Sequence, residues 1–422
     1  MVNYNNVLNA IKTRESVDVV YLFFLQIANY LIPLLTTPYL MAVLGAAGYG
    51  VVGFSFSVIQ YFLLIVDFGF NMSSAKRIAA ANKDAWNKIF TSVIIAKSIL
   101  LILSLLVMLI VLCIGKLSDY RTAILCFASL LIANTYTFFW LFQGIGKVRM
   151  ISIINTLSKV LVLPLTFVLV KDKDDVYMAI LLQSFVYVAA SIVSNYYLLR
   201  HRVVAFEKVS INDIKEEFHE SYPLFLSTAS TSVYTQLFTV ILGFTSTKEV
   251  VGCYSAAERI MRALCFMLYT PFSQAFFPKI AQLSSEDKIK AKRMLKYILS
   301  ATFAIMLLLA IVLFFGSDII VKYLGKDDYS LLPMILKIMS IVPIAIGCGA
   351  VLGQMGLVAL GNYKTKLAFR NTYLCLAPIS LIVVLLLSNL FGLYGITFSL
   401  VIAEYGVAAM MLYHYLRFNK KH

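Results

Sequence analysis

Charged side chains lie inside the long apolar segments of this 422-residue chain at eight positions that are more than two residues from a segment end. Each charge near the centre of a bilayer costs about 2.5–3.5 kcal/mol on an insertion scale, so these side chains are expected to face one another or a wet cavity. Five of the eight are basic and three are acidic, which leaves a surplus of two positive charges. The eight residues are Asp67, Lys97, Lys159, Glu258, Arg259, Arg262, Lys337 and Glu404.

The basic members of this set are the predicted binding residues. A cationic surplus in a cavity suits an anionic substrate, and a guanidinium binds phosphate through two parallel hydrogen bonds. We therefore expect Arg259, Arg262, Lys159 and Lys97 to line a cavity and to bind an anionic group. The alternative is that the charges form structural ion pairs, for example Glu258 with Arg262 at i, i+4 spacing.

Two carboxylates, Glu404 and Glu258, are assigned to ion coupling or charge balance. A mid-membrane carboxylate such as Glu404 can take up a proton or Na⁺ and so change its charge between two access states. The alternative is that Glu404 permanently neutralises a cavity base such as Lys97 or Lys159. We expect no cofactor other than a coupling H⁺ or Na⁺.

Motifs for metal binding and for catalysis are absent from the sequence. The six cysteines lie in apolar runs without a CxxC pattern, and the chain has only four histidines. It also has no GxxxxGK[ST] phosphate loop, no HExxH and no GxSxG. The sequence therefore predicts a protein that is not an enzyme and that has no metal site.

The elements that must position these charges are transmembrane helices. The chain is 61% hydrophobic and 14% charged, with a mean hydropathy of +0.86, whereas soluble domains are about 45–50% apolar and about 25% charged. Twelve apolar segments are each long enough to cross a bilayer as a helix. They are Val19–Leu40, Val51–Phe70, Ile89–Ile114, Ala123–Phe142, Met150–Val170, Val176–Leu199, Tyr222–Thr245, Val250–Phe277, Tyr297–Phe315, Leu331–Leu360, Ala368–Leu390 and Gly392–Leu416.

The polar loop Arg200–Ser221 separates six segments from six, which predicts two six-helix bundles, residues 1–205 and 206–422. The two halves look related, because Gly50 matches Gly252 at an offset of 202 residues. Halves repeated in this way transport by rocking about a central site.

Lysine and arginine in the loops predict the orientation. One side of the membrane would carry 24 of them and the other side 7, and the richer side is cytoplasmic. Both termini are therefore expected in the cytoplasm. The net charge of +15 then reflects topology and some affinity for anionic lipid, and no nucleic-acid partner is needed to explain it.

Two stretches carry a family resemblance. Gly45–Ala79 contains Phe68–Phe70 (FGF) followed by the basic turn Ala-Lys-Arg-Ile, and Val251–Leu283 looks like the matching signature of the second half. The chain resembles the Wzx-type O-antigen flippases, bacterial polysaccharide-transport proteins. This resemblance implies the fold of the MOP superfamily, to which the multidrug extruders also belong: an all-α membrane protein of about twelve helices, V-shaped around a central cationic cavity.

The resemblance also implies a function. The expected substrate is an undecaprenyl-pyrophosphate-linked oligosaccharide, moved from the cytoplasmic to the periplasmic leaflet of the bacterial inner membrane. We expect Arg259, supported by Arg262 or Lys159, to bind its pyrophosphate. Membrane lipids, a polysaccharide polymerase and a chain-length regulator are the expected partners. The alternative is a cation-coupled multidrug exporter of the same fold, which would favour an acidic cavity rather than a basic one.

Overall fold

The computed structural model describes residues 14–324 and 327–419, and within them it contains helices and no strand. The first seven α-helices are α2 (Arg14–Asp67), α3 (Phe70–Ala80), α4 (Lys83–Leu112), α5 (Arg121–Thr135), α6 (Phe139–Gly144), α7 (Val148–Leu169) and α8 (Val176–Arg200). The next six are α9 (Ile211–Thr245), α10 (Lys248–Glu286), α11 (Lys288–Leu324), α12 (Leu332–Met339), α13 (Val342–Ala350) and α14 (Tyr363–Asn419). Two short 3₁₀-helices, η1 (Gly115–Tyr120) and η2 (Asp327–Tyr329), and the π-helix η3 (Val351–Ala359) complete the order. This agrees with the expected all-α class.

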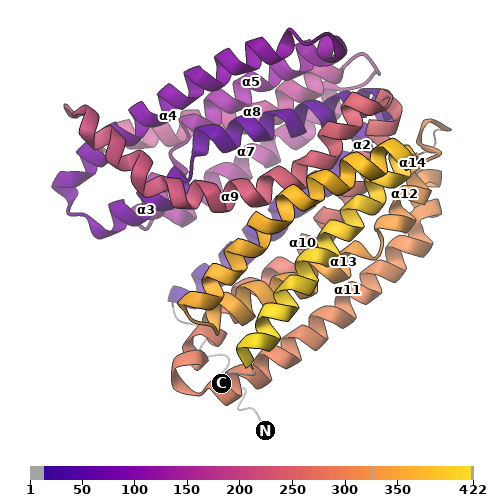
Figure 1. Cartoon of the computed structure of the whole chain (residues 1–422). Helices are drawn as coiled ribbons and strands as arrows, with labels where there is room; N and C mark the ends of the chain where they lie inside the picture. Colours follow the sequence, from indigo (N-terminus) through magenta and orange to yellow (C-terminus); the bar gives the residue numbers. More distant parts are fainter. Residues whose placement is uncertain (1–13, 325–326, 420–422) are drawn as a thin grey trace.

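Two of the helices are each broken by a glycine. Gly45 in α2 has φ 69°, and Gly392 in α14 has φ 54°, a left-handed conformation that favours glycine because it has no Cβ. The break in α14 leaves two legs, residues 363–391 and 393–419, which Figure 1 shows in gold and yellow. Both glycines lie at or close to boundaries between predicted apolar segments, so the sequence pattern located these turns.

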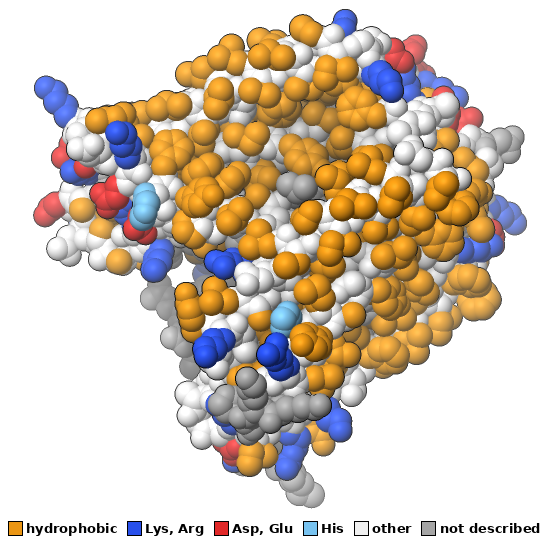
Figure 2. Space-filling view, in the orientation of Figure 1, with side chains coloured by type: hydrophobic (Ala, Val, Ile, Leu, Met, Phe, Trp, Pro, Cys, Tyr) orange, Lys and Arg blue, Asp and Glu red, His pale blue; other side chains and the backbone are white. Residues whose placement is uncertain are grey.

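The surface is that of a membrane protein. Figure 2 shows hydrophobic side chains over most of the visible face, with charged side chains gathered toward its margins. On α4, Ile102 is 60% exposed and Ile110 is 70% exposed, which suits contact with lipid rather than water.

Within residues 14–324 and 327–419, eight helices are long and apolar enough to cross a membrane, or nine if the bent pair Ile211–Ser230 and Thr235–Thr245 is one span. Two of the eight are the glycine-broken α2 and α14. The protein is therefore a multi-pass membrane protein. The count of twelve spans, the V-shaped outline and the two-bundle division at residue 205 stay predictions.

The N-terminal and C-terminal helices form two groups that lie together at one end of the molecule (Figure 1). Helix α2 of the first group packs closely against α10 of the second. A Cβ on Gly50 would lie 2.0 Å from the Lys248 carbonyl oxygen, and one on Gly252 would lie 1.9 Å from the Ala46 carbonyl oxygen. The two glycines that matched at an offset of 202 residues thus let the two backbones touch.

Two ion pairs join segments of the two groups at this same end. The Lys248 ammonium lies 2.8 Å from a carboxylate oxygen of Asp119, and the Lys173 ammonium lies 3.3 Å from one of Asp328. These pairs are exposed and contribute little stability individually. Together with the Gly50–Gly252 contact, they hold the two groups closed at the end that we call the η2 end.

Candidate functional site

A pocket of about 410 Å³ lies between the two helix groups, lined by α2, α9 and α10. We call it the central pocket. Phe56 and Ser57 line it from α2, and Gln236 lines it from α9. Helix α10 contributes the charged residues Arg259 and Arg262 together with Glu258. Half of the predicted site residues therefore line one cavity.

Arg262 bridges two carboxylates beside this pocket. Its Nε lies 2.9 Å from Glu258 Oε1, and its Nη2 lies 3.1 Å from Glu404 Oε1. Thr239 donates its hydroxyl to the other oxygen of Glu258 at 3.3 Å. Glu404 is only 5% exposed. The cluster of Thr239, Glu258, Arg262 and Glu404 ties α9, α10 and α14 together. With both acids ionised, it holds two negative charges and one positive charge.

Arg259 differs from Arg262 in its surroundings. Its guanidinium lies 5.7 Å from the ring centroid of Phe56, a cation–π arrangement. Within the described part of the chain it has no carboxylate at ion-pair distance, while it lines the central pocket and a second one. Arg259 is therefore the arginine whose donors are placed to meet a ligand.

The second pocket, of about 160 Å³, lies among α2, α5, α7 and α8 of the first group. We call it the first-group pocket. Lys159 of α7 and Arg259 of α10 line it together with apolar side chains such as Leu130 and Val162, and its described lining contains no acidic residue. It is consequently a small cavity whose wall combines two cationic groups with apolar and neutral polar side chains.

The other predicted charges lie elsewhere. Lys97 is 2% exposed, lines neither pocket, and pairs with Asp67 at 3.0 Å. Lys337 pairs with Asp318 at 2.8 Å. The structure thus brings Glu258, Arg262 and Glu404 into one cluster and places Arg259 in the wall of the same pocket as Glu258 and Arg262. It places Lys159 in the adjoining pocket and leaves Lys97 apart. No group of three metal-ligating side chains occurs among the described residues.

Comparison of the sequence with known proteins places this chain in a family. Residues 17–284 match the model of the family described as "Polysaccharide biosynthesis protein". The chain belongs to this family. The matched region contains Lys97, Lys159, Glu258, Arg259 and Arg262, whereas Glu404 lies beyond it.

A relative agrees with that assignment over nearly the whole length of this chain, and two solved structures share its fold. A protein of Escherichia coli strain K12 named "Putative O-antigen transporter" is 29% identical over 416 residues, which is 98% of this chain and 99% of that protein. The solved lipid II flippase MurJ, in an inward closed conformation, superposes with a TM-score of 0.74 at 14% identity, covering 95% of this chain and 89% of MurJ. An inward-facing multidrug resistance MATE transporter of the MOP superfamily superposes with a TM-score of 0.72 at 16% identity, covering 94% and 95%. These structures confirm the expected MOP-type fold.

The FGF motif used for the family resemblance has a clear structural role. Phe68 and Gly69 both have positive φ, 38° and 80°, and they turn the chain from α2 into α3. The turn places the Phe68 ring parallel to that of Phe225 on α9, with 4.4 Å between centroids. The motif therefore docks the start of α9 onto the first helix group.

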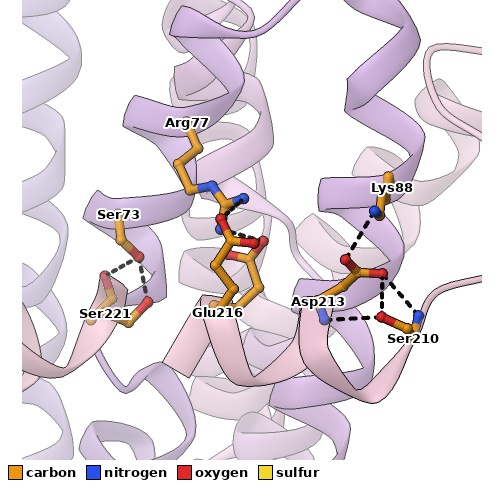
Figure 3. Close-up of polar contacts among 9 residues, drawn as sticks. Ser73, Arg77, Lys88, Ser210, Asp213, Glu216 and Ser221 are labelled. Atoms are coloured by element: carbon orange, nitrogen blue, oxygen red, sulfur yellow. Dashed lines mark hydrogen bonds and ion pairs between the residues drawn. The ribbon is translucent and has the colours of Figure 1, made fainter. Parts of the chain in front are cut away.

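Ion pairs that the sequence analysis did not anticipate strengthen this docking (Figure 3). Arg77 of α3 lies 3.1 Å from Glu216 and 2.9 Å from Glu217, and Lys88 of α4 lies 2.9 Å from Asp213. Ser210 and Asp213 form a capping box at the start of α9. The Ser-x-x-Asp spacing and the acid-rich loop were the available signals, but their basic partners lie more than 100 residues earlier in the chain.

The buried carboxyl group of Glu217 should make the stability of this docked segment depend on pH. The segment precedes the apolar part of α9. Burial raises the pKa of Glu217 to about 7, although the guanidinium of Arg77 favours the ionised form. Because the folded-state pKa lies above the ordinary value, this contribution to stability is fully present below about pH 4.5 and is lost as the pH rises through about 7. In detergent, the Tm is expected to fall by a few degrees between about pH 5 and about pH 8.

The Glu217→Gln variant should remove this fall, because glutamine mimics the protonated acid at all pH values. Glu216→Gln is the matched control, since Glu216 contacts the same Arg77 but is 59% exposed. A Tm that rises with pH in the unmodified protein would show that the Arg77 pair, rather than burial, controls the charge of Glu217.

Proposed function

We propose that this protein is a flippase for undecaprenyl-pyrophosphate-linked O-antigen or polysaccharide repeat units. It would move them from the cytoplasmic to the periplasmic leaflet of the bacterial inner membrane, with both termini in the cytoplasm. The observation that carries the proposal is Arg259, a guanidinium without an acidic partner in the described chain, in the wall of two pockets between membrane helices. A relative named as an O-antigen transporter, similar from end to end, supports it.

The pyrophosphate is proposed to bind at Arg259 with Lys159. A guanidinium can grip two phosphate oxygens at once, and the ammonium of Lys159 faces the same first-group pocket. Arg262 supports the site differently, because Glu258 and Glu404 already engage its donors. Lys97 neutralises Asp67 at a distance from the pockets.

Transport would proceed by alternating access. In the present conformation the two groups are joined at the η2 end by Gly50, Gly252 and two ion pairs. Release of the substrate on that side requires these contacts to separate while the groups approach each other at the other end. The protein would transport its substrate without catalysing a reaction, and H⁺ or Na⁺ would be the coupling ion. The transported repeat units would then reach a polymerase and its chain-length regulator.

A strain lacking this protein tests the proposal. Lipid-linked repeat units should accumulate in the inner leaflet, so a sugar-binding lectin applied to spheroplasts should label them much less than in the parent strain. Total lipid-linked glycan should not decrease. If labelling is unchanged and sensitivity to cationic drugs rises instead, the multidrug exporter is the correct function.

A further inference from the structure

The two pockets that share Arg259 differ in their chemistry. The central pocket, about 410 Å³, has neutral polar side chains from three helices, including Ser57 of α2, Gln236 of α9 and Ser255 of α10. The first-group pocket, about 160 Å³, has two cations and no acidic residue in its described lining, together with apolar side chains and the neutral polar Thr36, Thr166, Gln183 and Tyr187. Phe56 and Arg259 line both, so the pockets are neighbours on either side of one cation–π pair.

Ser57 and Gln236 line the central pocket without a hydrogen-bond partner in the described chain. Buried serines in a helix commonly donate to a carbonyl one turn earlier, as Ser158 does to Ile154 at 2.9 Å. Ser57 is 95% buried, since its exposed fraction is 5%, yet neither it nor Gln236 has a hydrogen bond within the described chain. A buried polar group without a partner costs about 1–3 kcal/mol. Ser57 in the pocket wall, with the half-buried Gln236 in the same wall, therefore points to a ligand that pairs them.

The chemistry of this wall matches a sugar. Sugar hydroxyls both donate and accept hydrogen bonds, and the Gln236 amide and Ser57 hydroxyl do the same. Phe56 and Phe266 add flat apolar surfaces against which a sugar ring can pack. The volume also falls in the range of about 300–1,000 Å³ that small-molecule pockets occupy, whereas the first-group pocket has room only for a compact group.

We infer that the central pocket binds the first sugars of the repeat unit while the first-group pocket takes the diphosphate, with Ser57 and Gln236 as the residues that read the sugar. This inference rests on the proposed function and assigns the two parts of its substrate to two places. It makes glycan selectivity and diphosphate binding separable by mutation, because Ser57 and Gln236 line only the central pocket and Lys159 lines only the first-group pocket.

Equilibrium binding to the purified protein can test this, with native mass spectrometry as the readout. The two probes are undecaprenyl diphosphate without a sugar and the same lipid bearing one N-acetylhexosamine. The unmodified protein should bind the sugar-bearing lipid more tightly. Ser57→Ala or Gln236→Leu should reduce that preference about tenfold, as expected for the loss of about one hydrogen bond, and should leave binding of the sugar-free lipid unchanged.

Ser55→Ala is the matched control. Ser55 is two residues from Ser57 on α2, is fully buried and also lacks a hydrogen-bond partner, but it lines neither pocket. Its variant should retain the full preference for the sugar-bearing lipid.

The outcomes separate this inference from the proposed function. Equal weakening of both lipids by Gln236→Leu and Ser57→Ala, or no preference for the sugar in the unmodified protein, would overturn the sugar assignment and leave the flippase standing. If Arg259→Ala binds both lipids as well as the unmodified protein does, the proposed function itself fails.

Discussion

Alanine in place of Arg259 is expected to abolish transport of the lipid-linked saccharide while the protein still reaches the membrane. Arg259 borders both pockets and, in the described chain, has no carboxylate partner that its removal would leave unpaired. Loss of its side chain should therefore cost little stability but remove the strongest phosphate contact, and charge-assisted hydrogen bonds are worth about 1.5–3 kcal/mol each. Flipping in proteoliposomes and surface glycan in cells are the measurements.

Arg259→Lys should rescue transport only in part, because an ammonium cannot form the two parallel hydrogen bonds of a guanidinium. Lys97→Ala is the contrasting variant. It removes a buried cation that lines neither pocket, but it leaves Asp67 without its partner. It should therefore lower abundance, and Lys97→Ala with Asp67→Asn should restore it. Normal glycan display in Arg259→Ala would remove Arg259 from the binding site.

Glutamine in place of Glu404 is expected to abolish the dependence of transport on an ion gradient. Glu404 and Glu258 share one guanidinium, that of Arg262, so the cluster carries an excess negative charge. A proton or Na⁺ could neutralise this excess in one access state and leave in the other, which would couple an ion gradient to the conformational change. Flipping by Glu404→Gln in proteoliposomes under an imposed pH or Na⁺ gradient is the measurement.

A purely structural role for Glu404 has a different signature. If it only neutralises Arg262, then Glu404→Gln should reduce the amount of folded protein, and Arg262→Gln in addition should restore it. Glu258→Gln is the internal control, because Glu258 contacts the same arginine from one turn away on α10. Gradient-dependent flipping that survives in Glu404→Gln would exclude coupling through this residue.

The sequence by itself determined the class of the protein. Long apolar segments, scarce charges and the absence of catalytic motifs predicted an all-helical, multi-pass membrane protein, and the FGF and Ala-Lys-Arg-Ile residues predicted the family that the comparisons confirm. These features are readable because each is local: a helix that crosses lipid must satisfy its own backbone and be apolar along its own length. The positive φ at Gly45 and Gly392 is also local, and both turns lie where the apolar pattern breaks.

Only the tertiary structure decided which intramembrane charges are paired. Arg259 and Arg262 are three residues apart on one helix, and no local pattern distinguishes them. Arg262 is paired because Glu404, 142 residues later, packs against it from α14, and Lys97 is buried against Asp67 of another helix. An ionised side chain in a medium of low dielectric is costly without a counter-charge, and helices distant in the chain supply that counter-charge to Arg262 and Lys97. Pairing, and hence the identity of the cation that faces the pockets, is therefore a property of helix packing.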